Sequence, residues 1–285
     1  MSAEINIEDR TINRGHQTSN SNYLMLHLLK IEWLKIKNYR AFWVFAVLYL
    51  VSIFIVTYIV WYVEQRTKAE IPESAMILGA SFGFPKVWQT VGWLSSWLLY
   101  FPGMIIIMLM VNEFNFKTHR QNIIDGWSRQ QFIGVKIAMV VIFSLLITLI
   151  NIITCLIFGS ITYGHFSMEG TSNIFFIFIQ ALAYLFFALM LAVLFRRSGL
   201  AIIIFFLYGI IFEWLISALT NFQFHLSPVG YFLPLQASDV LIPIFFGKKV
   251  FYPDSPSTTI LIITVLAYIT VYIFFARKKF LIDDL

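Results

Sequence analysis

Charged residues are scarce in this 285-residue chain. Asp, Glu, Lys and Arg make up 12% of the sequence, whereas apolar residues make up 59%. An average soluble protein has about 25% charged and about 45–50% apolar residues. The chain therefore has about half the charge that a soluble fold presents to water. This composition excludes a secreted disulfide scaffold, an acidic disordered protein and a soluble nucleic-acid binder, and it favours a single membrane domain.

Cysteine and the common catalytic motifs are also missing. The one cysteine, Cys155, lies in an apolar run, so neither an intrachain disulfide nor a metal cluster is expected. The sequence has no G-x-x-x-x-G-K-[ST] loop for nucleotide phosphates, no H-E-x-x-H motif and no G-x-S-x-G motif. The five histidines are scattered over the tail and loops. We therefore expect no catalytic residues, no metal site and no cofactor bound by this chain.

Long apolar runs are what the sequence has in abundance. A helix needs roughly 20 residues to cross a hydrocarbon core about 30 Å thick. Six runs are long enough, and they lie near 41–62, 88–111, 137–159, 174–195, 200–219 and 258–276. Apolar side chains surround these segments instead of forming one stripe, as expected for helices in lipid. The predicted fold is an all-α polytopic membrane protein with six transmembrane helices.

The placement of basic residues predicts the orientation. Fifteen of the twenty Lys and Arg residues fall in the segments on one side of this topology, and five fall on the other. Because basic residues are enriched in cytoplasmic loops, both termini are predicted to be cytoplasmic. Residues 1–22 form a polar tail that is not followed by an apolar region with a cleavage site, so no removable signal peptide is expected.

Residues 23–40 precede the first span and are too charged to cross the membrane. They predict an amphipathic interfacial, or connecting, helix with Trp33 at headgroup depth and lysines reaching anionic lipid. Its two sides carry apolar residues and polar residues respectively: Met25, Leu29, Trp33 and Ile36, and opposite them His27, Lys30, Lys37 and Asn38. Two roles are equally compatible with this pattern, a lipid anchor and a lever that joins the first span to a cytosolic partner.

The loop at 112–136 has the densest set of local signals. Thr118 with Gln121 and Ser128 with Gln131 both have the spacing of a capping box, and Gly126 suits a helix C-cap. These signals predict a short helix over 119–125, a turn, and a third span that begins near 129. The predicted loop has an apolar tip ringed by charges: Ile123, Ile124 and Trp127, with Arg120, Asp125 and Arg129. Such a tip is typical of a protein docking surface; the alternative is a loop that inserts its Trp into lipid.

The outer connection at 221–257 is apolar, but Pro228, Pro234 and Pro243 interrupt it. No straight span fits this segment, so short extracytoplasmic or re-entrant helices are predicted before the last span. Domain organisation is therefore predicted as a tail (1–22), an interfacial helix (23–40) and a transmembrane domain (41–285).

Glu213 is the only formal charge inside a predicted span. Burying a carboxylate in hydrocarbon costs about 2.5–3.5 kcal/mol, so this residue requires an explanation. One hypothesis is a proton-coupled carrier that uses Glu213. The other, which we favour, is a protonated or hydrogen-bonded carboxyl that holds helices together.

Aromatic residues recur at helical spacing in two of the predicted spans. Span two also contains a Pro102–Gly103 pair that predicts a kink. Packing or lipid contact is the usual role of such stripes, and a shared path for an amphipathic substrate is the alternative. The candidate path residues, with Glu213, are Trp93, Trp97, Tyr100, Phe205, Tyr208 and Phe212.

The order of these parts resembles the ABC-2 type permeases, the membrane subunits of ATP-binding-cassette transporters with the type V exporter fold. The closest local similarity is Glu113 to Lys136, in particular RQNIIDGWSRQQFIGVK, which is most similar to permeases of the Bacteroidetes group. Gly134 and Lys136 are separated by Val135, a departure from the family's Gly-Lys pair.

The resemblance implies a permease subunit of the bacterial cytoplasmic (inner) membrane that moves an unidentified substrate, with export favoured over import. It also implies a dimer with a second copy or a related permease, with a path between spans one, two and five. A separate ATPase subunit is expected to hold ATP and Mg and to dock on 113–136 and 23–40. No nucleic-acid partner is implied. The alternatives are the proton-coupled carrier and a membrane anchor of a larger machine.

Overall fold

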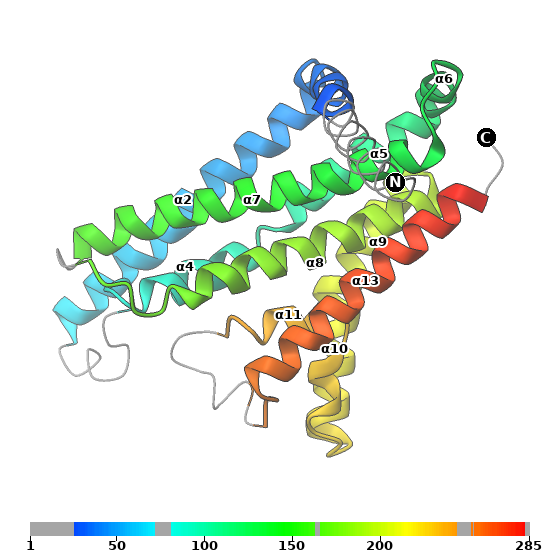
Figure 1. Cartoon of the computed structure of the whole chain (residues 1–285). Coiled ribbons are helices and arrows are strands. Elements are labelled where there is room, and N and C mark those ends of the chain that lie inside the picture. Colours follow the sequence, from blue (N-terminus) through cyan, green and yellow to red (C-terminus); the bar gives the residue numbers. More distant parts are fainter. Residues whose placement is uncertain (1–25, 72–80, 163–165, 244–251, 253, 283–285) are drawn as a thin grey trace, which may run out of the picture.

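The computed structural model describes residues 26–71, 81–162, 166–243, 252 and 254–282. Within these ranges every regular element is a helix (Figure 1). This confirms the predicted all-α fold. The tail at 1–22 and Met25 lie outside the described residues.

The described helices provide five candidate membrane spans, or six when one bent helix pair is counted as a span, at the positions of the six predicted spans. Five described helices are each long and apolar enough to cross a membrane: α2 (Arg40–Glu70), α7 (Arg129–Thr162), α8 (Ser172–Phe195), the helix Ser198–Gln223 and α13 (Thr258–Ile282). A sixth crossing consists of α4 (Val87–Ser96) and α5 (Tyr100–Asn115), which are bent by 46°. We call this bent pair span two and Ser198–Gln223 span five.

The break in span two differs from the predicted kink. The sequence suggests a kink at Pro102–Gly103, but α4 ends at Ser96 and α5 begins at Tyr100. Pro102 therefore lies in the first turn of α5, where its missing amide N–H removes no helical hydrogen bond. The proline begins a new helix instead of bending a continuous one.

Span five is irregular, and short helices follow it. It consists of α9 (Ser198–Phe206), the π-helical turn η1 (Leu207–Phe212), α10 (Glu213–Ala218) and a second π-helical turn, η2 (Leu219–Gln223). The 3-10 helix η3 (Val229–Phe232) and α11 (Gln236–Asp239) come next, which confirms short helices before the last span. π-Helical turns frequently occur near functional sites.

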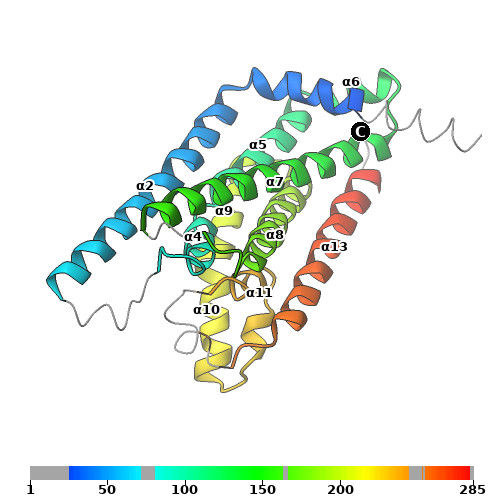
Figure 2. The ribbon, with the colours of Figure 1, turned by 60° about the vertical axis from the view of Figure 1, so that its left-hand side comes forward.

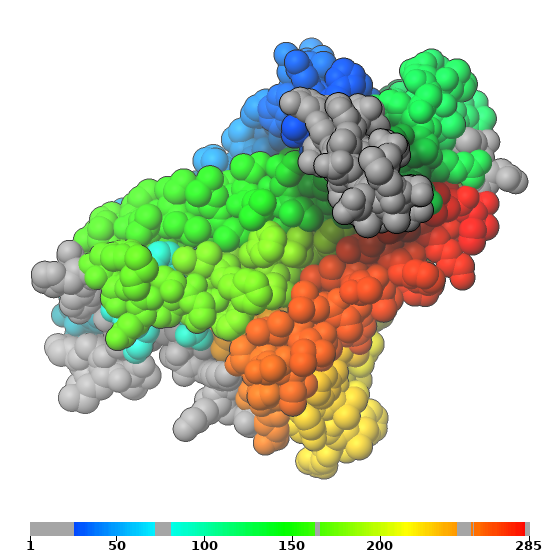
Figure 3. All heavy atoms as spheres, viewed as in Figure 1, coloured from blue at the N-terminus to red at the C-terminus, as the bar shows by residue number. Residues whose placement is uncertain are grey.

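Helix α8 lies at the centre of the bundle. In its most apolar stretch 67% of the residues are buried, compared with 17% for α2 and 22% for span five. Figure 2 shows α8 between α7 and α13. Alanines at 181, 183, 188 and 192 are fully buried, and such small side chains allow neighbouring helices to approach closely. Span five, in contrast, projects from one side of the bundle (Figure 3).

The loops predicted to share one side of the membrane meet at one end of the bundle. There Phe132 of α7 stacks on Phe280 of α13 with ring centroids 4.9 Å apart. At the opposite end, Trp61 Nε1 of α2 donates to Thr162 Oγ1 of α7 over 3.0 Å. Helix α6 (Thr118–Ile124) lies at the first of these ends (Figure 1).

Candidate functional site

The loop between spans two and three forms a short helix, as predicted. Helix α6 covers Thr118–Ile124, one residue earlier than the predicted 119–125. Lys117 turns the chain at its start with a left-handed backbone (φ 54°), and Gly126 turns it again after its end (φ 100°). A glycine adopts this second conformation without the steric cost that a Cβ carries. α6 therefore stands between two sharp turns.

One of the two predicted capping boxes is present and the other is wrong. Gln131 N donates to Ser128 Oγ over 3.1 Å, and Ser128 N donates to Gln131 Oε1 over 2.8 Å. At the other motif Lys117, not Thr118, holds the N-cap position of α6. The Thr118 hydroxyl instead donates to the Glu113 carboxylate. Thr118 is the first residue inside α6 and not its N-cap, so its hydroxyl does not occupy the capping position.

Of the three residues of the predicted apolar tip, one is exposed. The side chain of Ile124 is 78% exposed, Arg120 and Asp125 beside it are exposed, and Ile123 is half-buried. Gln121 Nε2 donates to Asp125 Oδ1 over 3.0 Å, which orders this surface. We call Arg120, Ile124 and Asp125 the α6 tip.

Trp127 and Arg129 face the bundle instead of the solvent. The half-buried Trp127 packs on the apolar core, and Lys35 Nζ lies 5.9 Å from the centroid of its ring. Arg129 Nη1 donates to the Leu281 carbonyl over 2.9 Å. These two predicted docking residues thus tie the loop to the interfacial helix and to α13.

The interfacial helix, described over 26–37, buries one face against the bundle. Leu28, Glu32 and Ile36 are buried, whereas Lys30, Trp33 and Lys37 are exposed. Trp33 is 49% exposed and contacts Phe42 edge to face, with centroids 6.3 Å apart. Of the predicted apolar side, Ile36 is buried in the bundle, whereas Trp33 lies on the exposed surface, where its contact with lipid headgroups stays a prediction. The helix is rotated so that Glu32 reaches charged partners inside the bundle.

A buried ionic cluster joins three helices beneath this loop. Lys136 Nζ of α7 lies 2.5 Å from Glu32 Oε2 and 2.8 Å from Glu113 Oε1 of α5. Lys35 Nζ lies 2.9 Å from Glu32 Oε1 and 3.1 Å from Glu113 Oε1. Two carboxylates thus meet two ammonium groups, and the formal charges cancel. We call these four residues the ionic cluster.

Three members of the ionic cluster are shielded from water. Glu32, Glu113 and Lys136 are each at most 6% exposed. Burial lowers the pKa of Lys35, but the carboxylates of Glu113 and Glu32 raise it by more, so its pKa lies above the usual value. Separating such buried charges is costly because each would lose its partner in a medium of low dielectric constant. The interfacial helix, α5 and α7 are therefore held together at this end.

Glu32 was not among the residues singled out from the sequence. Leu28, Glu32 and Ile36 follow one another at four-residue spacing, so the glutamate occupies an apolar register of the helix. The burial of Glu32 could therefore have been predicted from this spacing. Its partners could not have been predicted, because Glu113 and Lys136 are 81 and 104 residues away along the chain.

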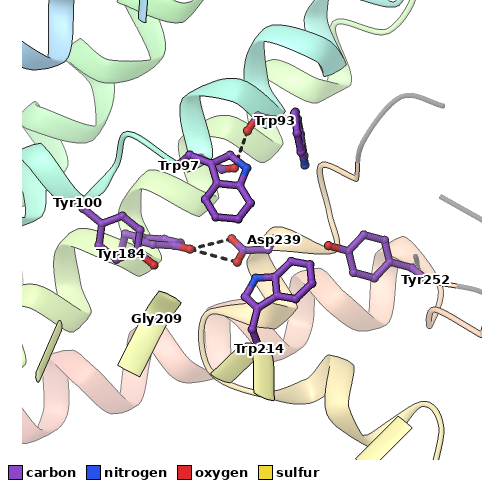
Figure 4. A pocket seen from close by; sticks show the side chains of 9 residues that line it. Trp93, Trp97, Tyr100, Tyr184, Gly209, Trp214, Asp239 and Tyr252 are labelled. Atoms are coloured by element: carbon purple, nitrogen blue, oxygen red, sulfur yellow. Dashed lines mark hydrogen bonds between the residues drawn. The ribbon is translucent and has the colours of Figure 1, made fainter. Parts of the chain in front are cut away.

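On the opposite half of the bundle, three predicted path residues line one cavity. Trp93, Trp97 and Tyr100 of span two meet side chains that the sequence did not single out (Figure 4): Tyr184, Trp214, Asp239 and Tyr252. Asp239 was missed because its partners lie on α8, 55 and 59 residues earlier.

The second aromatic stripe serves mainly packing. Phe205 is fully buried against Tyr100, with centroids 5.2 Å apart, and Tyr208 lies 5.2 Å from Phe187. Phe212 is 50% exposed on span five. None of these three lines the cavity.

Glu213 connects span five to the segment between η3 and α11. Its carboxylate is 1% exposed, and Oε1 accepts a hydrogen bond from the backbone N–H of Leu235 over 2.6 Å. This contact supports the hypothesis of a carboxyl that holds helices together.

The fold and its charged end define a polytopic helical membrane protein whose sequence carries no nucleotide-binding loop. Residues 28–212 match the family model described as ABC-2 family transporter protein, and the chain belongs to this family. No curated protein matches the chain. The protein is thus the permease, or membrane subunit, of an ABC-2 transporter, as the resemblance predicted. Permeases of this family lack an ATPase domain and pair with ABC ATPase subunits.

Proposed function

We propose that this permease exports an unidentified substrate with energy from a separate ATPase subunit that docks on the α6 tip and the interfacial helix. The exposed Ile124 between Arg120 and Asp125 is the observation that carries this proposal. An apolar side chain surrounded by charged ones has the composition of a protein interface, with an apolar centre and a polar rim.

The ionic cluster gives the docking surface a connection to the spans. Thr118 of α6 binds Glu113 of α5, and Glu113 binds Lys136 of α7 and Lys35 of the interfacial helix. A displacement of α6 is therefore passed to spans two and three and to the interfacial helix. ATP and Mg bind to the partner. The nucleotide-bound and nucleotide-free forms of the partner bind the two conformations of the permease with unequal affinity, and this difference shifts the permease from one conformation to the other.

The substrate path in this proposal lies between two permease copies, or between this chain and a related permease. Helix α2 and span five have the least buried apolar stretches of the single-helix spans, at 17% and 22%. A partner surface formed by spans one, two and five covers part of this apolar area. Lipid covers the remainder.

The end that carries α6 faces the cytoplasm in this proposal. The basic residues of the interfacial helix, the 112–136 loop and the end of α13 are concentrated at this end, as the positive-inside rule requires. The protein is then a multi-pass component of the bacterial inner membrane with both termini in the cytoplasm.

Ile124→Asp tests the docking surface. The wild-type chain, purified from its own cells, is expected to retain an ATPase subunit, and the variant is expected to lose at least about tenfold of it because a charge enters the apolar centre of the interface. Met168→Asp is the matched control, since Met168 is 72% exposed at the opposite end of the bundle. The readout is the amount of ATPase subunit per permease after purification.

Equal retention by Ile124→Asp and the wild type would contradict docking at α6. Substrate transport by the purified permease alone, in vesicles without nucleotide, would contradict the whole proposal.

A further inference from the structure

The cavity in the outer half of the bundle combines aromatic rings with one carboxylate. It lies where the break in span two meets α8, span five and the outer segment, and its lining residues are Trp93, Ser96, Trp97, Tyr100, Tyr184, Gly209, Trp214, Asp239 and Tyr252. Figure 4 shows the Asp239 carboxylate near the middle of this group, with Tyr184 on one side and the Tyr252 hydroxyl pointing toward it from the other. Six aromatic rings therefore surround one acid.

The carboxylate is held in place by neutral donors. Tyr184 Oη donates to Asp239, with distances of 3.0 and 3.1 Å to the two carboxylate oxygens, and Gln180 Nε2 donates to Oδ1 over 2.9 Å. Both donors belong to the central helix α8. Within the described ranges, no lysine or arginine forms a salt bridge with Asp239, in contrast to the glutamates of the ionic cluster. The Asp239 carboxyl is thus held in position by hydrogen bonds, and no basic side chain of the described ranges is paired with it.

The electrostatics of this arrangement favour a positively charged guest. Aromatic faces carry negative partial charge and therefore attract cations. Burial raises the pKa of Asp239 to about 7, and hydrogen bonds from Gln180 and Tyr184 limit the rise. A bound cation compensates for the lost hydration of the ionised carboxylate, which a purely apolar guest does not do.

The size of the cavity restricts the guest further. Its free volume is about 20 Å³, which accommodates one or two water-sized groups. An ammonium group with its first methylene is of this size, whereas a trimethylammonium group is several times larger. Trp97 and Trp214 are 48% and 39% exposed, with ring centroids 6.4 Å apart, so the cavity opens between indoles on the apolar surface of the bundle. An alkyl tail is accommodated outside this opening.

We propose that this cavity binds the primary ammonium head of an amphipathic amine, with Asp239 as the counterion and the two indoles against the adjoining methylene groups. Calling this amine the transported substrate rests on the proposed export function. The binding itself needs neither an ATPase nor nucleotide, so it can be tested separately from docking.

The test uses the full chain in lipid nanodiscs at about pH 8, with hexylammonium as the probe and isothermal titration calorimetry as the readout. Saturable binding of about one hexylammonium per chain is expected, after subtraction of empty nanodiscs. Hexanol and hexyltrimethylammonium are expected to bind at least about tenfold more weakly, the first because it lacks charge and the second because of its head size. Affinity for hexanol equal to that for hexylammonium would reduce the cavity to an apolar void and overturn the proposal. Equal affinity for hexyltrimethylammonium would overturn the primary-amine assignment.

Asp239→Asn keeps the shape of the side chain and removes its charge. This variant is expected to bind hexylammonium about 10- to 100-fold more weakly, as found when a charged hydrogen-bond partner is lost. Glu70→Gln is the control, because Glu70 is an exposed carboxylate at the end of α2, and its affinity is expected to stay unchanged.

Trp97→Leu provides a second variant in case Asp239→Asn fails to fold. Trp97 is half exposed, so its removal leaves the core intact, and about a fivefold loss of affinity is expected because leucine covers less of the adjoining methylene groups than the indole does. Unchanged affinity in Asp239→Asn or Trp97→Leu, or no saturable binding by the wild type, would overturn the proposal. Each of these failures leaves the result for Ile124→Asp unaffected.

Discussion

Lys136 is the residue on which the ionic cluster depends most, because its ammonium group contacts both carboxylates. Lys136→Met leaves Glu32 and Glu113 buried with Lys35 as their one remaining lysine in the cluster. We expect this variant to lose about 3–5 kcal/mol of unfolding free energy, as is found when one partner of a buried ion pair is removed. Thermal unfolding in detergent is the measurement.

Lys35→Met is the comparison for this prediction. The Lys35 side chain is 32% exposed, so water replaces part of its interaction and the expected loss is smaller. In a double variant, Glu32→Gln is expected to restore part of the stability that Lys136→Met loses, because it removes one of the unpaired charges. A loss from Lys136→Met no larger than that from Lys35→Met would contradict the assigned role.

Single residues also show where local sequence signals are sufficient. Ser128 and Gln131 form the capping box that their spacing predicts. Thr118 has the same spacing to Gln121, but Glu113 takes its hydroxyl. The difference depends on Lys136 and Lys35, which hold Glu113 in the ionic cluster, and neither of these contacts is local in the sequence.

At the scale of elements, the contact between spans two and five depends on small residues. A Cβ added at Gly103 of α5 would overlap the ring of Phe205, which is fully buried. Gly103→Ala is therefore expected to lower stability by about 1–3 kcal/mol, the usual cost of overpacking. The midpoint of thermal unfolding reports this change.

Gly134→Ala is the matched control for this substitution. Gly134 lies inside α7, and a Cβ added there meets nothing within 4 Å. Since alanine favours helix over glycine, the control is expected to be neutral or to stabilise by up to about 1 kcal/mol. If both variants unfold at the same temperature, the close contact at Gly103 does not contribute to stability.

The elements themselves were largely predictable, because six long apolar runs have few arrangements other than membrane helices. Their ends were less so. The first span was predicted to end near 62, but α2 continues to Glu70, where Lys68 pairs with Glu64. A hydropathy pattern stops at the first charges, whereas the helix continues when those charges pair with each other along one face.

At the scale of the whole molecule, orientation is the property to test first. Cys155 is fully buried, so the wild-type chain should not react with a membrane-impermeant maleimide. Arg120→Cys on α6 is expected to be labelled only after the membrane is permeabilised, and Met168→Cys is expected to be labelled in intact cells. Labelling extent on a gel is the measurement. The reverse pattern would place α6 outside the cell and remove it from reach of a cytoplasmic ATPase.

The candidate sites were only partly predictable at this scale. The loop at 112–136 carries its own turns and caps, so its exposed tip follows from local chemistry. The ionic cluster and the aromatic cavity each draw residues from at least three separate segments. These residues meet because of the way each helix is rotated about its own axis. Packing around α8 sets this rotation, and the uniformly apolar sequences of the spans do not indicate it.

The deep burial of α8 has a consequence for the catalytic cycle of the complete transporter. A helix enclosed by neighbours of close-fitting shape cannot slide or tilt without opening voids, which are costly. Spectroscopic probes placed on α8 and α13 should accordingly keep a constant separation through successive rounds of ATP turnover. Probes on α2 and span five, which have few packing partners within the subunit, should be the ones whose separations change.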